Sequence, residues 1–110
     1  MRKTERITEV TVKHENGTQW VLVYYLQIIP SKAEGDLYAL RVDKISRDGI
    51  LLERAETYAL TDSRQEALLM LNAFASGTVL PSVLLEMADE WDFHQPATQN
   101  TPARTYHRAG

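Results

Sequence analysis

Residues 19–29 read QWVLVYYLQII, and this stretch decides the fold. It is rich in the β-branched and aromatic residues that strands favour, and it is too short to cross a bilayer as a helix. Its residues alternate between two apolar sets, which are Trp20, Leu22, Tyr24, Leu26 and Ile28, and Val21, Val23, Tyr25 and Ile29. A strand that is apolar on both faces belongs in the centre of a sheet, or meets a partner on one face.

Turn signals on both sides of this stretch predict an antiparallel meander. Asn16-Gly17 comes before it, and this dipeptide suits the positive φ angles of a type I′ hairpin turn. Pro30 ends the stretch, and Asp48-Gly49 marks a second tight turn further along. The predicted strands cover residues 5–14, 19–29, 36–45 and 50–60.

Alternation within the other strands assigns their faces. In residues 5–14, Val10 and Val12 lie on one face and Ile7 on the other. In residues 36–45, Tyr38, Leu40 and Val42 face inward, and Arg41 and Asp43 lie outward on a solvated strand. Residues 50–60 alternate imperfectly, which indicates a bulge or an edge position.

Two helices follow the strands. Ser63 is a predicted N-cap that forms a capping box with Glu66. The first helix then buries Ala67, Leu68, Met70, Leu71, Phe74 and Ala75, and Gly77 is its predicted left-handed cap. Pro81 opens a second helix, whose buried stripe comprises Leu84, Met87, Ala88 and Trp91.

The predicted fold is therefore α+β: a four-stranded antiparallel β-meander followed by two helices packed on one sheet face. One domain spans residues 1–93. Residues 94–110 are polar and carry two prolines without any periodicity, which predicts a flexible tail.

Composition narrows the class of protein. The chain has 110 residues and no cysteine, so disulfides and thiolate zinc sites are excluded. Its net charge is −3 and its pI is about 5.6, which is not the basic balance of a nucleic-acid-binding domain. The charged N-terminus lacks the apolar segment of a signal peptide, so we expect a cytoplasmic protein that has no membrane contact.

Several segments together resemble a family of short proteins from Gram-positive bacteria and their mobile elements, known only as a domain of unknown function. They are Tyr24-Tyr25-Leu26, residues 37–42, Thr61-Asp62-Ser63 and residues 77–86, and the resemblance covers roughly residues 18–92. The chain departs from the family pattern at Ala39, where we expect glycine, and at the inserted Leu80. The resemblance carries no active site. It implies a small inhibitor of host machinery, of the anti-CRISPR kind.

No catalytic, cofactor or metal motif stands out. The chain has neither a Gly-x-Ser-x-Gly elbow nor a His-Glu-x-x-His pair, and its glycines are isolated, so we expect no enzyme. An acidic face with a nearby histidine lies on the second helix and comprises Glu86, Asp89, Glu90, Asp92 and His94. Glu86 and Glu90 could share a cation, but a solvated helix face is the favoured interpretation.

The remaining hypothesis is contact with another protein. Two helices cover only one face of a sheet, so Val21, Val23 and Tyr25, with Ile29, would face outward and bind a second copy or a target protein. The alternative is that the sheet covers itself. Glu86, Asp89 and Glu90 could meet the basic channel of a nuclease. A weakly basic end at Arg104, Tyr106, His107 and Arg108 is a further candidate contact.

The sequence thus predicts a non-catalytic protein-binding protein without cofactors, in its narrowest form an inhibitor of a defence nuclease. Two alternatives stay open: a homodimeric regulatory or structural module, and a domain that binds a small ligand.

Overall fold

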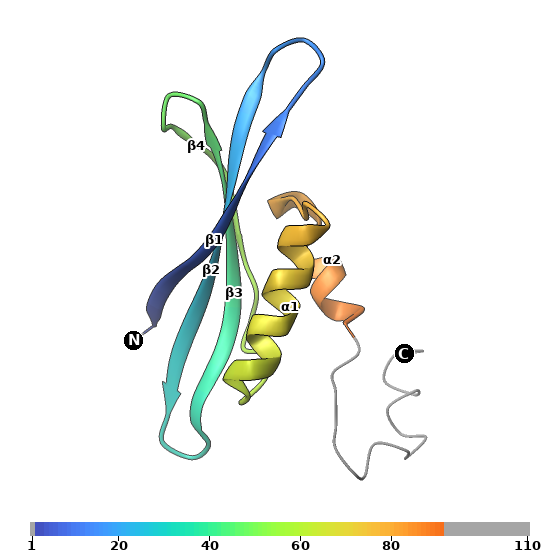
Figure 1. Cartoon of the computed structure of the whole chain (residues 1–110). Coiled ribbons are helices and arrows are strands. Elements are labelled where there is room, and N and C mark those ends of the chain that lie inside the picture. Colours follow the sequence, from blue (N-terminus) through green and yellow to red (C-terminus); the bar gives the residue numbers. More distant parts are fainter. Residues whose placement is uncertain (1, 92–110) are drawn as a thin grey trace.

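Four strands form one antiparallel sheet in a computed structural model that describes residues 2–91 (Figure 1). They are paired in chain order as β1-β2-β3-β4, which confirms the predicted meander. Their bounds are β1 Lys3–Lys13, β2 Gln19–Ser31, β3 Gly35–Ser46 and β4 Leu51–Glu56. The central position of β2 and β3 fits their apolar composition, and β1 and β4 are the edges.

Two helices and a short 3₁₀ turn follow the sheet and lie on one side of it (Figure 1). Their bounds are α1 Arg64–Ser76, η1 Pro81–Val83 and α2 Leu84–Asp89. The predicted α+β fold is confirmed. Pro81 occupies the first position of η1, so the second helical segment begins as predicted, but with a 3₁₀ turn.

Both Gly-containing turns close hairpins, but not as type I′ turns. Gly17 and Gly49 have φ of +91° and +89°, whereas Asn16 keeps a negative φ. The His14 N–H donates to the Thr18 carbonyl at 2.8 Å, which closes a three-residue loop. Such a loop needs positive φ only at its glycine, and the Asn16 side chain adds a hydrogen bond by accepting the N–H of Thr18 at 2.9 Å. The predicted turn type is therefore wrong, although both hairpins are confirmed.

Bulges change the faces of both edge strands. The register of β1 against β2 shifts between Arg6 and Thr8, and Ile7 packs against the core together with Val10 and Val12. The sequence placed Ile7 on the opposite face, because strict alternation does not allow for an extra residue. In β4 the register skips Leu52, which confirms that the imperfect alternation there marks both a bulge and an edge.

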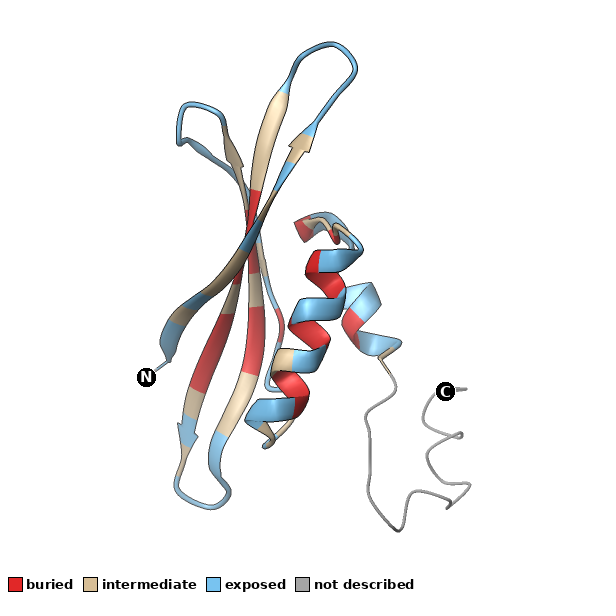
Figure 2. Cartoon of the chain, in the orientation of Figure 1, coloured by how far each residue is buried: buried red, intermediate tan, exposed pale blue. Residues whose placement is uncertain are grey.

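The core lies between the sheet and α1 (Figure 2). It contains the predicted face of β2 except Trp20, and the predicted stripe of α1. Its most buried large side chains include Leu22, Tyr24, Leu26, Met70 and Leu71. The Tyr24 hydroxyl donates to the Val79 carbonyl at 2.9 Å, so this buried polar group has a partner. Burial raises the pKa of Tyr24 to about 12.

The N-terminal end of α1 is capped by Ser63, and Glu66 in its first turn binds the chain that follows α2. The Ser63 side chain accepts the N–H of Glu66 at 3.1 Å, which confirms the predicted N-cap. The reciprocal bond of the predicted capping box is wrong, because the Ser63 N–H donates to the Thr61 hydroxyl at 3.1 Å. The Glu66 carboxylate accepts the indole N–H of Trp91 at 2.9 Å, and the Trp91 ring meets Phe74 edge-on. These contacts attach the chain after α2 to α1.

The C-terminal cap lies one residue later than predicted. Gly77 has φ of −87°, and Thr78 is the residue with a left-handed φ of +56°. The N–H of Thr78 donates to the Ala75 carbonyl, and that of Val79 donates to Phe74, which is the hydrogen-bond pattern of a Schellman motif. The prediction was wrong because it assumed that the glycine occupies the left-handed position.

The second helical segment buries fewer residues than its sequence pattern predicts. Leu84 and Ala88 are buried and Trp91 is half-buried, but Met87 is 38% exposed. The predicted stripe was therefore too wide at Met87.

Candidate interaction surfaces

The first predicted surface is the helix-free face of the sheet. The alternate residues of β2 that do not enter the core, Val21, Val23, Tyr25 and Ile29, lie there as expected. They do not form an open apolar face, since Val23 is only 1% exposed and the other three are half-buried. These side chains therefore expose less apolar area for binding a partner than their alternation in the sequence predicted.

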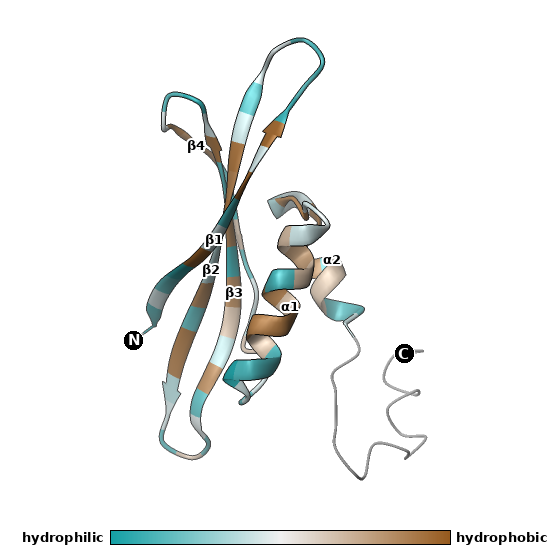
Figure 3. Cartoon of the chain, in the orientation of Figure 1, coloured by the Kyte–Doolittle hydropathy of each residue, from teal (hydrophilic) through white to brown (hydrophobic). Residues whose placement is uncertain are grey.

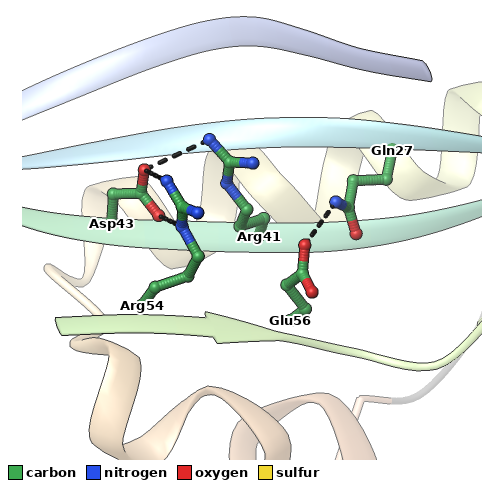
Figure 4. Close-up of polar contacts among 5 residues, drawn as sticks. All are labelled: Gln27, Arg41, Asp43, Arg54 and Glu56. Carbon is green, nitrogen blue, oxygen red and sulfur yellow. Dashed lines mark hydrogen bonds and ion pairs between the residues drawn. The ribbon is translucent and has the colours of Figure 1, made fainter. Parts of the chain in front are cut away.

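A charged cluster explains why this face is covered (Figure 4). Asp43 of β3 is 2% exposed, and Arg54 of β4 donates to its two oxygens at 2.8 and 3.0 Å. Arg41 donates to the same carboxylate at 3.2 Å. Both arginines compensate the buried charge of Asp43 while their aliphatic stems cover apolar surface. The predicted solvated strand is therefore wrong for Asp43 and also for Arg41, whose side chain is only 17% exposed.

The cluster extends along the sheet. The guanidinium of Arg41 lies 4.2 Å from the centre of the Tyr25 ring, in a cation–π contact, and Arg41 Nε is buried without an acceptor among residues 2–91. Next to it, the buried Gln27 donates to Glu56 at 2.7 Å (Figure 4). Gln27 also accepts from Arg2 at 2.7 Å. The sheet thus covers this face with its own side chains, the alternative that the sequence left open.

The second predicted surface lies on α2. Glu86 and Asp89 lie on α2 and Glu90 is its C-terminal cap, and all three are exposed. The Tyr58 hydroxyl donates to Asp89, and this hydrogen bond raises the pKa of Tyr58. Since Val21, Val23 and Tyr25 lie on the opposite side of the sheet, the structure does not bring the two predicted sets together. Asp92, His94 and the predicted tail contact lie outside the described residues.

A third surface was missed by the sequence analysis. Eight large apolar side chains are exposed among residues 2–91. Seven of them belong to β4 and its flanks or to η1 and α2, and the eighth, Leu69, belongs to α1. β4 lies against both η1 and α2 (Figure 3 shows the hydropathy of these elements). We name these residues of neighbouring elements together the β4–α2 surface, and it comprises Ile50, Leu51, Leu52, Tyr58, Val83, Leu85 and Met87. The pairing of Leu51 with Ile45 places Leu51 on the helix-free face of the sheet, whereas η1 and α2 lie on the other.

Part of this surface had a signal in the sequence. Three consecutive apolar residues, Ile50 to Leu52, follow the Asp48-Gly49 turn, and such a run on an edge strand must expose some of its members. The position of η1 and α2 beside β4 had no such signal, because it depends on tertiary packing.

The charge around η1 and α2 is one-sided. Residues 65–91 contain no lysine or arginine, whereas Glu86, Asp89 and Glu90 are exposed on or beside α2. On β4, Glu53 and Glu56 are exposed, and the cation between them, Arg54, is paired with Asp43. The exposed apolar residues of η1 and α2 thus have acidic neighbours, whereas Ile50 just before β4 lies close in sequence to the exposed Arg47.

A hollow, the absence of a metal cluster and the absence of a membrane span complete the description of residues 2–91. A shallow hollow runs along the outer flank of α1, and its lining residues are Arg64, Gln65, Leu68, Leu69 and Asn72. Within residues 2–91, no three His, Asp or Glu side chains gather in a way that could hold a metal ion. None of the helices in this part of the chain has the length and apolar character that a membrane span requires.

Comparison of the chain with protein-family models, with curated proteins and with solved structures found no match.

Proposed function

We propose that this protein is a non-catalytic binding module that acts by contact with another protein through the β4–α2 surface. The observation that carries the proposal is that seven of the eight exposed large apolar side chains among the described residues belong to β4 with its flanks, η1 and α2, which are neighbouring elements. Exposing apolar side chains together is costly in water, and such patches mark interaction surfaces. Of the residues predicted from sequence, the proposal keeps Glu86, Asp89 and Glu90 and replaces the β2 set.

Three leucines make a matched test. Leu52, Leu85 and Leu69 are each 47% exposed, but only the first two belong to the β4–α2 surface. The full-length chain and the variants Leu52→Ser, Leu85→Ser and Leu69→Ser are used as baits for affinity capture. We expect a partner that binds the parent chain and Leu69→Ser and is lost from the other two. Capture of the same proteins by all four baits, or of none, would contradict the proposal.

Inhibition of a defence nuclease, which the sequence resemblance implies, is the narrower form of this proposal. It is tested by adding the chain to candidate RNA-guided nucleases and measuring DNA cleavage. We expect inhibition that Leu52→Ser and Leu85→Ser weaken and Leu69→Ser does not. Unchanged cleavage at saturating protein would remove the nuclease from the proposal and leave protein contact to the capture experiment.

A further inference from the structure

We infer that a C-terminal segment of this chain, residues 104–108, docks on one side of α2 and covers part of the β4–α2 surface. The inference goes beyond the proposed function, because it concerns what occupies this part of the surface in the free protein. It rests on an apolar and acidic stripe along α2, on the lack of cations near that stripe in the sequence, and on the composition and reach of the chain that follows α2.

The stripe combines apolar and acidic side chains at helical spacing. Val83 and Met87 are 37% and 38% exposed, and Glu86 and Glu90 are exposed as well. These four positions recur at i, i+3, i+4 and i+7, which places them on one side of the segment that runs from the end of η1 to the C-terminal cap of α2. The buried residues of α2 lie at other positions. We name these four residues the α2 stripe.

The negative charge of the α2 stripe has no compensation nearby in the sequence. Each acidic residue between positions 2 and 85 has a lysine or arginine within four positions of it. Glu86, Asp89 and Glu90 have none at that separation. A local excess of one sign of charge beside exposed apolar side chains attracts a segment that is basic and partly apolar.

The chain beyond the described residues carries such a segment. Residues 104–108 read RTYHR, with two arginines, one histidine and no acidic side chain. Arg104 and Arg108 supply guanidinium donors for the two carboxylates of the α2 stripe. Tyr106 lies between them in the sequence and supplies a ring that can cover the apolar side chains of the stripe, where the methionine sulfur favours aromatic contact.

The connection between α2 and this segment gives it the necessary reach. Residues 92–103 extend to at most about 40 Å, whereas the six residues of α2 are only about 9 Å long. A segment tethered in this way acts at an effective concentration on the order of millimolar, so contacts that are weak between separate molecules suffice. The same segment of a second copy lacks this advantage, which favours docking within one chain.

A spin label on the segment tests the inference in the full-length protein. The chain has no cysteine, so Ala109→Cys provides a single attachment site next to the segment. Paramagnetic broadening of the amide resonances in NMR then identifies the described residues that the segment approaches. A tether alone brings the label near α2 part of the time, so the reference is R104Q/R108Q with the same label.

We expect the strongest broadening at residues 83–90, and a decrease there of at least about twofold in R104Q/R108Q, as for the loss of two exposed ion pairs. E86Q/E90Q should cause a similar decrease. E15Q/E34Q, which removes two exposed carboxylates from the hairpin loops, should leave the broadening unchanged. Added salt should decrease it in the parent chain by screening the charges.

Equal broadening in the parent chain and in R104Q/R108Q would overturn the inference, since the tether alone would then account for it. Strongest broadening at other residues, or an equal decrease in E15Q/E34Q, would overturn it as well. Broadening of an isotope-labelled chain by an added spin-labelled chain would assign the segment to a second copy and exclude docking within one chain. None of these results depends on a captured partner, so the proposed function is tested separately by the leucine variants.

Discussion

At the scale of the residue, Asp43 is the feature that alternation could not predict. Its position in β3 correctly assigns it to the helix-free face, where a carboxylate normally meets water. In the structure it is 2% exposed, because Arg54 and Arg41 bend over it from β4 and β3. Side-chain alternation reports the face of a sheet, but burial there depends on which long side chains lie across it.

The substitution Asp43→Asn should destabilise the protein by about 1–3 kcal/mol, since it removes the charge that compensates two arginines near the sheet. The loss stays below that of a fully buried pair because Arg54 remains 44% exposed and can turn to water. Urea unfolding measures the change. Glu9→Gln, which breaks the exposed pair with Arg6, should change stability by less than about 0.5 kcal/mol. Equal effects of the two substitutions would contradict the buried role of Asp43.

The raised pKa of Tyr24 predicts how the free energy of unfolding changes at alkaline pH. Its folded pKa is raised by burial to about 12, above the value of about 10 in an unfolded chain. The folded state therefore favours the neutral phenol, so this contribution to stability is complete below pH 10 and is lost as the pH rises from 10 through 12. The shift corresponds to about 2–3 kcal/mol.

The variant Tyr24→Phe separates this effect from other titrations. It should be less stable at pH 7, because the Val79 carbonyl loses its donor, by about 1–2 kcal/mol. Its stability should fall less steeply than that of the parent chain above pH 10. Tyr58, whose pKa is also raised, is present in both proteins and cancels in the difference. Parallel curves in urea unfolding at pH 9, 10.5 and 11.5 would show that Tyr24 is not responsible.

At the scale of the element, the C-terminus of α1 stores strain. Thr78 holds a left-handed φ of +56°, which costs a β-branched residue about 1–2 kcal/mol. Gly77, one residue earlier, has an ordinary helical φ, and a Cβ there would meet the nearest atom at 3.6 Å, without a clash. A glycine would therefore suit the left-handed position 78, and a residue with a Cβ would fit at position 77.

Exchanging them should stabilise the protein. We expect Gly77→Ala with Thr78→Gly to raise the free energy of unfolding by about 1 kcal/mol, measured by urea or thermal unfolding. The same threonine-to-glycine change at the exposed Thr11 of β1, where φ is negative, should lower it by about 0.5–1 kcal/mol. A loss of stability in the exchanged variant would show that Thr78 is not strained.

Elements were more predictable than their ends. The apolar alternation of β2, the Gly-containing hairpins and the Ser63 cap are local signals, and the structure confirms each of them. Ile7 and Thr78 departed from the prediction by a single residue, through a bulge and through a shifted cap. Such shifts cost little free energy, so tertiary packing decides them and local pattern does not.

At the scale of the whole molecule, the sheet has one face under the helices and the other under its own charged side chains (Figures 1 and 4). A dimer that joined two sheets face to face would have to desolvate Arg41, Arg54 and Arg2, with little apolar area gained in return. The edges do not favour self-pairing either, since β1 and β4 each carry a bulge and exposed charges. The sequence could not predict these costs of dimerisation, because they depend on the hydrogen bonds and ion pairs that side chains form between strands.

These arguments predict that the full-length chain is monomeric in light scattering, with a mass near 12.5 kDa. Val21→Ser and Tyr25→Ser should leave that mass unchanged, because neither side chain lies in an interface. Twice this mass, reduced to the monomer by either substitution, would restore the sheet face as the binding surface and point to a homodimeric module. Since Val23 beside them is 1% exposed, such a dimer would also require the arginine cluster to open, and that opening would be measurable as faster amide exchange in β3.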